Sequence, residues 1–343
     1  MSVADGAPGF GPACVRAVLW GLAGIHRIVL EGWLATYRLG WARVTRLPAE
    51  VIAFGNLSMG GTGKTLAVFR LAREISATGK RVAVLSRGHG RTTRDEQVVL
   101  FAPDAPPTCS PLEVGDEPYL LAAGLPGIPV LVGKNRRHTG QRAIDEFHAD
   151  VLILDDGFQY WRLHKDREIV LIDALQPPGR NHLFPRGLLR EPWSHLARAQ
   201  EVWITHAQLA PPERVRQFTQ RVNRYAPRAQ VRYTEHHPRY LRTPDGRQAP
   251  LTALHGHPVL ALSGLGHPEQ FETMLATLGA TPVPCRFADH HIYTAEDIAA
   301  IAARLTPDML VVTTAKDALR LPAPLPFAVW IVEVEMVEVA LPD

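Results

Sequence analysis

The sequence predicts an α/β fold: a doubly wound parallel sheet, a second, smaller α/β domain and an N-terminal amphipathic helix. Three observations support this prediction. Short buried strands alternate with helical patterns along most of the chain. A Gly-rich loop ending in Lys-Thr joins the first of these strands to a helix. Acidic residues follow two later strands, at the sheet edge where doubly wound folds bind ligands.

Length and composition fit a soluble globular protein of about two domains. The chain has 343 residues, of which 46% are hydrophobic and 21% charged, which excludes a disordered chain or a multi-span membrane protein. The three cysteines, Cys14, Cys109 and Cys285, are far apart, so a disulfide framework and a structural zinc site are not expected and a reducing, cytosolic location fits. A net charge of +3 is too small to indicate nucleic-acid binding. Only five of the 37 basic residues are lysine, which codon preference explains more simply than phosphate recognition does.

The N-terminal segment from Cys14 to Tyr37 carries apolar residues at three- and four-residue steps, which predicts a helix. Its longest uncharged run, residues 17–25, is shorter than the roughly 20 residues that span a membrane. Two interpretations remain. The helix could pack into the core of a soluble domain, which this segment alone favours. It could instead lie in a membrane interface, with arginines on its polar face and Trp20 and Trp33 nearby.

A phosphate-binding loop follows the strand predicted over residues 50–54. The segment Gly55-Asn-Leu-Ser-Met-Gly-Gly-Thr-Gly-Lys-Thr65 precedes a helical pattern, which is the context of a P-loop NTPase-like fold. Lys64 is expected to reach the β- and γ-phosphates, and the Thr65 hydroxyl to bind Mg²⁺. Ser58 stands where the strict pattern requires Gly. The residues expected to bind the nucleotide are Ser58, Met59, Gly60, Gly61, Thr62, Gly63, Lys64 and Thr65.

Two aspartates follow the strand predicted over residues 150–154. An apolar strand that ends in acid is the Walker B arrangement, so Asp155 or Asp156 is expected to support Mg²⁺ beside the phosphate loop. The alternative is a pair of exposed turn residues. Further strands are predicted over residues 81–85 and 168–172, the second ending at Asp173. The base-reading motif of GTPases is absent, which favours ATP over GTP weakly.

The phosphate loop resembles that of the tetraacyldisaccharide 4′-kinases, the lipid A 4′-kinase family, which also carries Ser at the place of Ser58. Seven further segments resemble the family in the same order, at residues 86–91, 115–118, 155–159, 184–192, 263–268, 287–293 and 312–317. The resemblance covers residues from about 14 to 320. It departs from the family at Leu66, His89 and Tyr160, which touch loop details more than chemistry.

The resemblance implies an ATP-dependent kinase of lipid A biosynthesis. The γ-phosphoryl group would go to the 4′-hydroxyl of a tetraacyldisaccharide 1-phosphate, with Mg²⁺, at the cytoplasmic face of the bacterial inner membrane. The implied partners are this acylated lipid and the membrane surface, with no nucleic acid and no obligate protein partner. An acylated substrate lies in the bilayer, so the N-terminal helix is now expected to be a peripheral, monotopic anchor.

The resemblance also implies roles for single residues. Lys64 and Asp116 are expected to be catalytic, Asp116 as the base for the sugar hydroxyl, with His290 supporting it. Without the family, Asp116 would be interpreted as a helix cap, and His290 and His291 as surface residues or a metal pair. The expected metal ligands are Thr65, Asp155, Asp156 and Glu191. The candidates for substrate phosphate or transition-state charge are Arg87, Arg91, Arg137 and Arg190.

The predicted domain limits are 1–40 for the membrane-associating helix, 41–228 for the P-loop kinase domain, 229–256 for a β linker and 257–343 for the smaller α/β domain. Gly264-Leu-Gly266 lacks the third Gly of a dinucleotide fingerprint and is interpreted as a strand-to-helix turn. Two competing functions stay open: a P-loop GTPase or ATPase that serves a metal or protein partner, and a membrane-peripheral nucleotide-binding scaffold without transfer chemistry.

Overall fold

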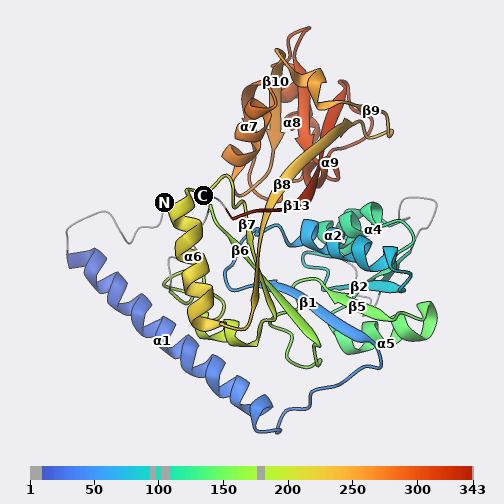
Figure 1. Cartoon of the computed structure of the whole chain (residues 1–343). Helices are drawn as coiled ribbons and strands as arrows, with labels where there is room; N and C mark the ends of the chain where they lie inside the picture. The colour runs from blue at the N-terminus through green and yellow to red at the C-terminus, as the bar shows by residue number, and fades with distance from the viewer. Residues whose placement is uncertain (1–9, 93–97, 102–108, 176–181, 342–343) are drawn as a thin grey trace. The chain divides into compact units, whose positions relative to one another are not determined.

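The computed structural model describes residues 10–92, 98–101, 109–175 and 182–341, which fold into two compact units (Figure 1). Unit 1 comprises residues 1–87, 133–235 and 337–343, and unit 2 comprises residues 88–132 and 236–336. Strands β8 (Gln230–Arg242) and β13 (Val329–Val339) contribute residues to both. Unit 2 takes in residues 88–132, which the predicted limits assign to the kinase domain; those limits remain a prediction.

A parallel sheet forms the centre of unit 1, with its strands paired in the order β2-β5-β1-β6-β7-β8. The first strand of the sequence therefore lies in the middle, and the chain crosses outward on both sides of it. Such sheets bind ligands at the carboxyl ends of their central strands. Besides β8, the strands of this sheet are β1 (Glu50–Asn56), β2 (Val82–Ser86), β5 (Val151–Leu154), β6 (Arg167–Asp173) and β7 (Glu201–Thr205). The predicted doubly wound sheet is confirmed.

Continuous apolar runs form these strands because both faces of the sheet are covered by helices. All four residues of β5 and six of the seven in β1 are buried. Helices α2 (Lys64–Ala77) and α5 (Arg136–Phe147) pack on the β2 side, and α6 (Pro212–Tyr225) packs on β7. A short 3₁₀ helix, η2 (Trp193–Arg198), precedes β7.

Gly55 allows the acidic segment to approach β1 closely. A Cβ atom added at Gly55 would lie 2.3 Å from the Cβ of Phe158, so no larger residue fits without movement. The backbone N–H of Gly157 donates to the Phe54 carbonyl over 2.7 Å. Through these contacts the Asp155-Asp156-Gly157-Phe158 segment is packed against the strand that leads into the phosphate loop.

Helix α1 (Phe10–Arg38) runs along the outside of unit 1 (Figure 1). Among its residues from 14 onward only Ala23 and Leu34 are buried. A core-packing helix would bury its apolar stripe, so that interpretation is wrong. Residues Cys14–Arg38 are long and apolar enough, by length and composition, to cross a membrane, which corrects the expectation drawn from the uncharged run alone. The exposed apolar residues of α1 are Val15, Val18, Trp20, Leu22, Ile25, Ile28, Val29 and Trp33.

Unit 2 contains a further set of parallel strands, paired in the order β11-β10-β12-β13. Along β10, Val259 and Ala261 join one hydrophobic cluster while Leu260 and Leu262 join another, so both faces of this part of the sheet are buried. The strands and helices that lie wholly in unit 2 are β3 (Val98–Leu100), α3 (Pro111–Val114), α4 (Asp116–Gly124), β4 (Val130–Val132), β9 (Gln248–Ala249), η3 (Leu251–Leu254), β10 (Pro258–Ser263), α7 (Pro268–Thr277), β11 (Thr281–Arg286), α8 (Ala295–Ala302), β12 (Leu310–Thr314) and α9 (Ala315–Ala318). The predicted second α/β domain is confirmed.

Candidate active site

The phosphate loop connects β1 to α2, as its sequence predicted. Gly60 and Gly63 have φ angles of 111° and 82°, which side-chain-bearing residues rarely adopt, so the glycines are required by the backbone. The Asn56 side chain donates to the Gly60 carbonyl over 3.3 Å and contacts the Thr62 hydroxyl at 3.4 Å. Ser58 forms an isolated antiparallel bridge with Leu189. The loop is thus held from inside by Asn56 and at its start by the 188–189 segment.

The two aspartates after β5 have different surroundings. Asp155 is buried and accepts a hydrogen bond from the Ser86 hydroxyl over 3.2 Å. Asp156 has a φ of 52°, and its carboxylate lies 3.6 Å from the Lys64 Nζ and 2.9 Å from the Arg190 Nη1. Burial opposes ionisation of Asp156, but the positive charges of Lys64 and Arg190 outweigh it and hold the pKa of this carboxyl below its usual range. The structure therefore brings together Lys64, Asp156 and Arg190.

The side chains near the loop fit magnesium and a phosphate. A hydroxyl and carboxylates are the oxygen donors that Mg²⁺ prefers, and Mg²⁺ usually takes one or two protein ligands beside substrate phosphates. Among the described residues, no group of three His, Cys, Asp or Glu side chains forms a metal cluster. The buried Arg136 Nε has no hydrogen-bond partner among the described residues, which suits an anion nearby.

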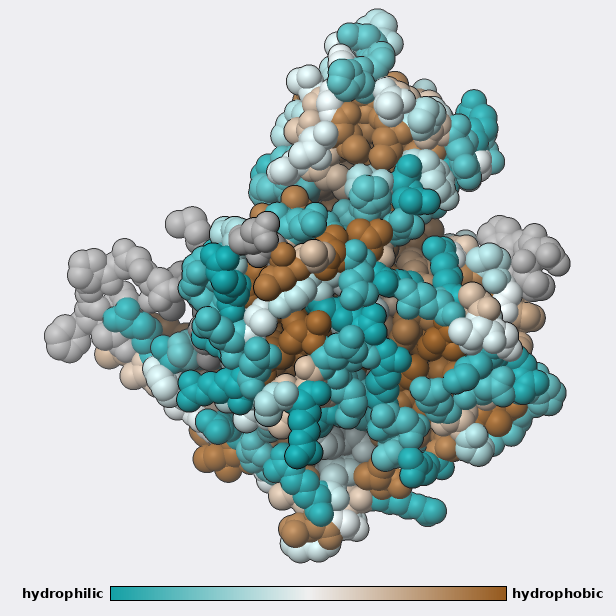
Figure 2. Space-filling view, viewed as in Figure 1, coloured by the Kyte–Doolittle hydropathy of each residue, from teal (hydrophilic) through white to brown (hydrophobic). Residues whose placement is uncertain are grey.

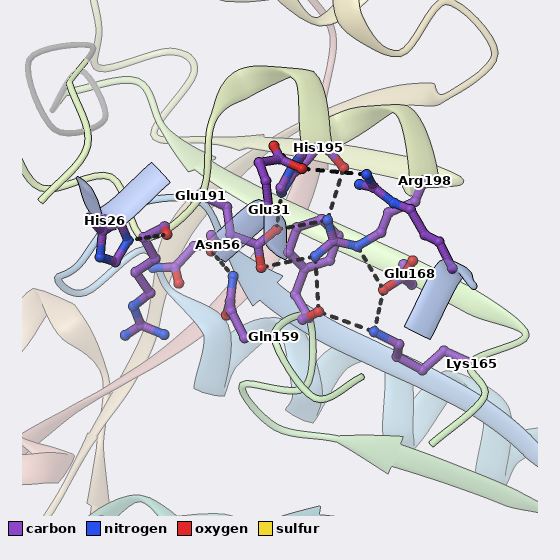
Figure 3. A network of polar contacts seen from close by, with 12 residues as sticks. His26, Glu31, Asn56, Gln159, Lys165, Glu168, Glu191, His195 and Arg198 are labelled. Carbon is purple, nitrogen blue, oxygen red and sulfur yellow. Dashed lines mark hydrogen bonds and ion pairs between the residues drawn. The ribbon is translucent and has the colours of Figure 1, made fainter. Parts of the chain in front are cut away.

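Glu191, expected from the resemblance to lie near the metal, is instead held by protein side chains (Figure 3). Its carboxylate is 1% exposed and accepts from the Arg198 guanidinium over 2.8 and 3.1 Å, and it lies 2.7 Å from the His195 Nδ1. Burial opposes its ionisation, but the His195 hydrogen bond and the Arg198 charge keep the pKa of Glu191 below its usual range. Its role as a metal ligand stays a prediction.

This network extends in two directions from Glu191 (Figure 3). On one side the His195 Nε2 lies 2.9 Å from a carboxylate oxygen of Glu31, which belongs to α1. On the other side the Arg198 guanidinium donates to the Phe158 carbonyl over 3.0 Å and lies 3.4 Å from the centroid of its ring. Helix α1 is therefore linked through partly buried polar contacts to the segment that carries Asp155 and Asp156. Neither Glu31 nor His195 belongs to a sequence motif that could have revealed this link.

In unit 2, Asp116 and His290 lie together, as the resemblance implied. The His290 Nδ1 is 3.3 Å from the Asp116 Oδ2, although the two residues are 174 positions apart. Gly115, with a φ of 97°, occupies the N-cap position of α4, and Asp116 is the first residue of the helix. No side chain caps this helix by a hydrogen bond, so the interpretation of Asp116 as a helix cap is not supported. His291 contacts Asp297 at 2.8 Å, so the two histidines have separate partners and do not form a metal pair.

A third member of this cluster, Arg320, was not found by sequence reasoning. Its Nε and Nη2 donate to the same Asp116 oxygen over 2.9 and 2.5 Å, and Nη2 lies 2.9 Å from the His290 Nδ1. The Lys316 Nζ lies 3.3 Å from the other ring nitrogen of His290. Arg320 comes three residues after the matched segment 312–317, but nothing local in the sequence points to its partner.

The four arginines proposed for substrate phosphate or transition-state charge do not share a partner in the part of the chain that the structure describes. Arg190 pairs with Asp156, as described above. The Arg137 Nε lies 3.4 Å from the Asn135 side chain, and the Arg91 Nη1 lies 3.5 Å from the Val132 carbonyl. Arg87 is exposed at the end of β2. Sequence reasoning missed Arg136, which is 4% exposed; burial lowers its pKa, against the attraction of Asp155.

The comparisons with known proteins agree with this geometry. The family model described as Tetraacyldisaccharide-1-P 4'-kinase matches residues 15–341. The chain belongs to this family. It is similar to the tetraacyldisaccharide 4'-kinases of Anaeromyxobacter dehalogenans strain 2CP-C, with 42% identity over 84% of this chain and 76% of that protein, and of Syntrophus aciditrophicus, with 41% identity over 81% and 77%.

A solved structure also matches. The "apo" form LpxK from Aquifex aeolicus, in complex with ATP, superimposes with a TM-score of 0.77 at 29% identity, covering 95% of each chain. Family membership and this likeness confirm the predicted fold and activity: an ATP-dependent kinase of lipid A biosynthesis that uses Mg²⁺.

Proposed function

We propose that Lys64 and the backbone of residues 60–63 hold the phosphates of ATP, and that Thr65 with Asp155 or Asp156 binds Mg²⁺. ATP supplies the phosphoryl group, and Mg²⁺ when bound neutralises its charge. The pairing of Lys64 and Arg190 with Asp156 supports this assignment, because it keeps the two cations and the carboxylate together. Arg190 and the buried Arg136 would balance the negative charge of the transferred group.

We propose that Asp116 accepts the proton of the 4′-hydroxyl of a tetraacyldisaccharide 1-phosphate. A sugar hydroxyl is a poor nucleophile, so a carboxylate within hydrogen-bond reach is needed to take its proton. The single observation that carries this role is the placement of Asp116 beside His290, since two segments far apart in the sequence converge on one partly exposed carboxylate. His290 would keep that carboxylate oriented.

Transfer of labelled phosphate from ATP to a tetraacyldisaccharide 1-phosphate in detergent micelles tests these roles. Lys64→Ala is expected to lower kcat about 100-fold or more, as for other removed electrostatic contacts. Asp116→Ala is expected to lower kcat by roughly 10²–10⁴ with ATP affinity retained. Lys80→Ala is the matched control, because Lys80 forms an exposed pair with Glu50.

Equal losses of ATP affinity and turnover in Asp116→Ala would refute its role as base. ATP hydrolysis without labelled lipid, increased by a metal or protein partner, would favour the partner-serving ATPase. ATP binding with neither reaction would favour the scaffold.

We propose further that α1 lies on the cytoplasmic face of the inner membrane, where ATP is available to a lipid-bound acceptor. The exposed apolar residues of α1 support this placement. The face drawn in Figure 2 mixes hydrophilic side chains with separate hydrophobic patches. A membrane-spanning orientation is disfavoured by Arg27 and Glu31, each of which would cost about 2.5–3.5 kcal/mol near the bilayer centre. Contacts of His26 with the Arg190 carbonyl and of Glu31 with His195 also hold α1 on its own unit.

Sedimentation with vesicles of phosphatidylethanolamine and phosphatidylglycerol tests this placement. Ile28→Glu and Val29→Glu change residues that are 73% and 65% exposed, and they should lower vesicle binding at least tenfold without changing thermal stability. Leu209→Glu is the matched control, because Leu209 is 58% exposed outside α1. Unchanged binding of both α1 variants would refute the monotopic anchor.

A further inference from the structure

The Arg320 guanidinium is a buried charge whose hydrogen bonds go to a distant residue. Its side chain is 3% exposed, and it follows the short helix α9. An acid lies much closer in the chain: Asp317, three residues earlier, is fully buried and 3.6 Å from the Arg320 Nη1. Yet Nη1 has no hydrogen-bond partner among the described residues, and the N–H groups of Nε and Nη2 are directed at Asp116, 204 positions away.

Each oxygen of Asp317 already accepts a hydrogen bond from a residue of its own surroundings. One accepts from the backbone N–H of Gly264 over 3.0 Å, and the other accepts from the Thr314 hydroxyl over 2.8 Å. Asp317 also caps the first turn of α9 together with Thr314, whose hydroxyl accepts from the Asp317 N–H over 3.1 Å. Asp317 thus fixes the turn from which Arg320 extends, and the Nε and Nη2 groups of Arg320 face Asp116.

The contacts on Asp116 are one-sided. Arg320 donates twice to Oδ2, and His290 approaches the same oxygen at 3.3 Å. Oδ1 has no hydrogen-bond or ion-pair partner among the described residues, and the side chain keeps 17% of its surface exposed. The two N–H groups of Arg320 on Oδ2 fix the plane of the Asp116 carboxylate and leave the lone pairs of Oδ1 free. That is the geometry required of a group that must accept a proton from a positioned hydroxyl.

We propose that Arg320 is a positioning residue for the phosphoryl-transfer reaction: it holds Asp116 by Oδ2 so that Oδ1 is the oxygen that takes the proton. This inference rests on the proposed role of Asp116. Lysine cannot replace Arg320 fully, because an ammonium is a single point charge and cannot place two fixed N–H groups on one oxygen. The charged groups that face Asp116 and His290 here are Arg320, Lys316 and Asp289.

A double-mutant cycle on lipid phosphorylation tests the proposal. Arg320→Met should lower kcat roughly 100-fold, the loss typical of a misplaced catalytic group, with the KM for ATP within about twofold. In the Asp116→Asn background the same substitution should cause almost no further loss, because a residue that acts through Asp116 has nothing left to position. Arg320→Lys should show an intermediate kcat. Arg286→Met is the matched control, since Arg286 pairs with Glu269 and Glu272 on the surface of the same unit.

The outcomes separate this inference from the proposed function. If Asp116→Asn retains activity, the role of Asp116 as base is wrong and the inference falls with it. If Asp116→Asn keeps only a small residual kcat but Arg320→Met has a wild-type kcat, or if the loss caused by Arg320→Met multiplies fully in the double variant, only the inference is overturned. Should Arg320→Met fail to fold, Arg320→Lys decides: a wild-type kcat with an unchanged melting temperature would refute the positioning role.

Discussion

Replacing Glu191 with glutamine should destabilise unit 1, because it removes one charge from a buried ion pair. Glu191 is 1% exposed and receives two hydrogen bonds from Arg198. Removing one partner of such a pair costs about 3–5 kcal/mol, since the other charge stays buried. Glutamine keeps a hydrogen bond to His195, so we expect the lower end, about 3 kcal/mol. The melting temperature should then fall by roughly 6–12 °C.

Thermal unfolding followed by tryptophan fluorescence measures this change. Trp193 is the reporter, because it lies on the same 3₁₀ helix as Arg198. Glu213→Gln is the matched control, because Glu213 forms an exposed pair with Arg216 and should change stability by less than about 0.5 kcal/mol. The double variant Glu191→Leu with Arg198→Met should recover part of the loss, because it removes both charges of this pair, while Glu168, which Arg198 contacts at 3.3 Å, keeps its pairing with Lys165.

The effect should depend on pH in a defined direction. The pKa of Glu191 is lower in the folded protein than its ordinary value of 4.5. Its contribution to stability is therefore present above pH 4.5 and is lost as the pH falls through the folded-state pKa. The difference between the wild type and Glu191→Gln should shrink below pH 4.5. An unchanged melting temperature combined with a higher Mg²⁺ requirement would refute the ion-pair reasoning and support the metal role implied by the family.

Two further substitutions test the packing and charge of the phosphate site. Gly55→Ala should destabilise the protein by about 1–3 kcal/mol, because its new methyl group meets Phe158 at 2.3 Å, whereas Gly21→Ala in α1 has open space; equal melting temperatures would contradict this. Asp156→Asn should raise the Mg²⁺ concentration for half-maximal activity and lower kcat about 100-fold. The surface change Asp145→Asn should do neither, and wild-type Mg²⁺ dependence of Asp156→Asn would exclude it from the metal site.

Much of the fold was predictable because the relevant signals are contiguous in the chain. The apolar runs 50–54 and 150–154 predicted β1 and β5, since strands buried on both faces need uninterrupted apolar residues. The phosphate loop was equally clear, because its glycines, Lys64 and Thr65 are adjacent and their backbone geometry is local. The helix from Cys14 to Tyr37 was also predicted, but periodicity could not tell whether its apolar stripe faces protein or solvent.

The sequence by itself therefore determined the family, the phosphate loop, the strand order in the chain and the acidic segment after β5. Only the tertiary structure decided which side chains meet. The pairing of Asp116 with Arg320 and of Glu31 with His195 joins residues from different elements across more than a hundred positions. Secondary structure repeats over three or four residues and can be recognised locally. The partner of a buried charge depends on how elements pack, which no local pattern encodes.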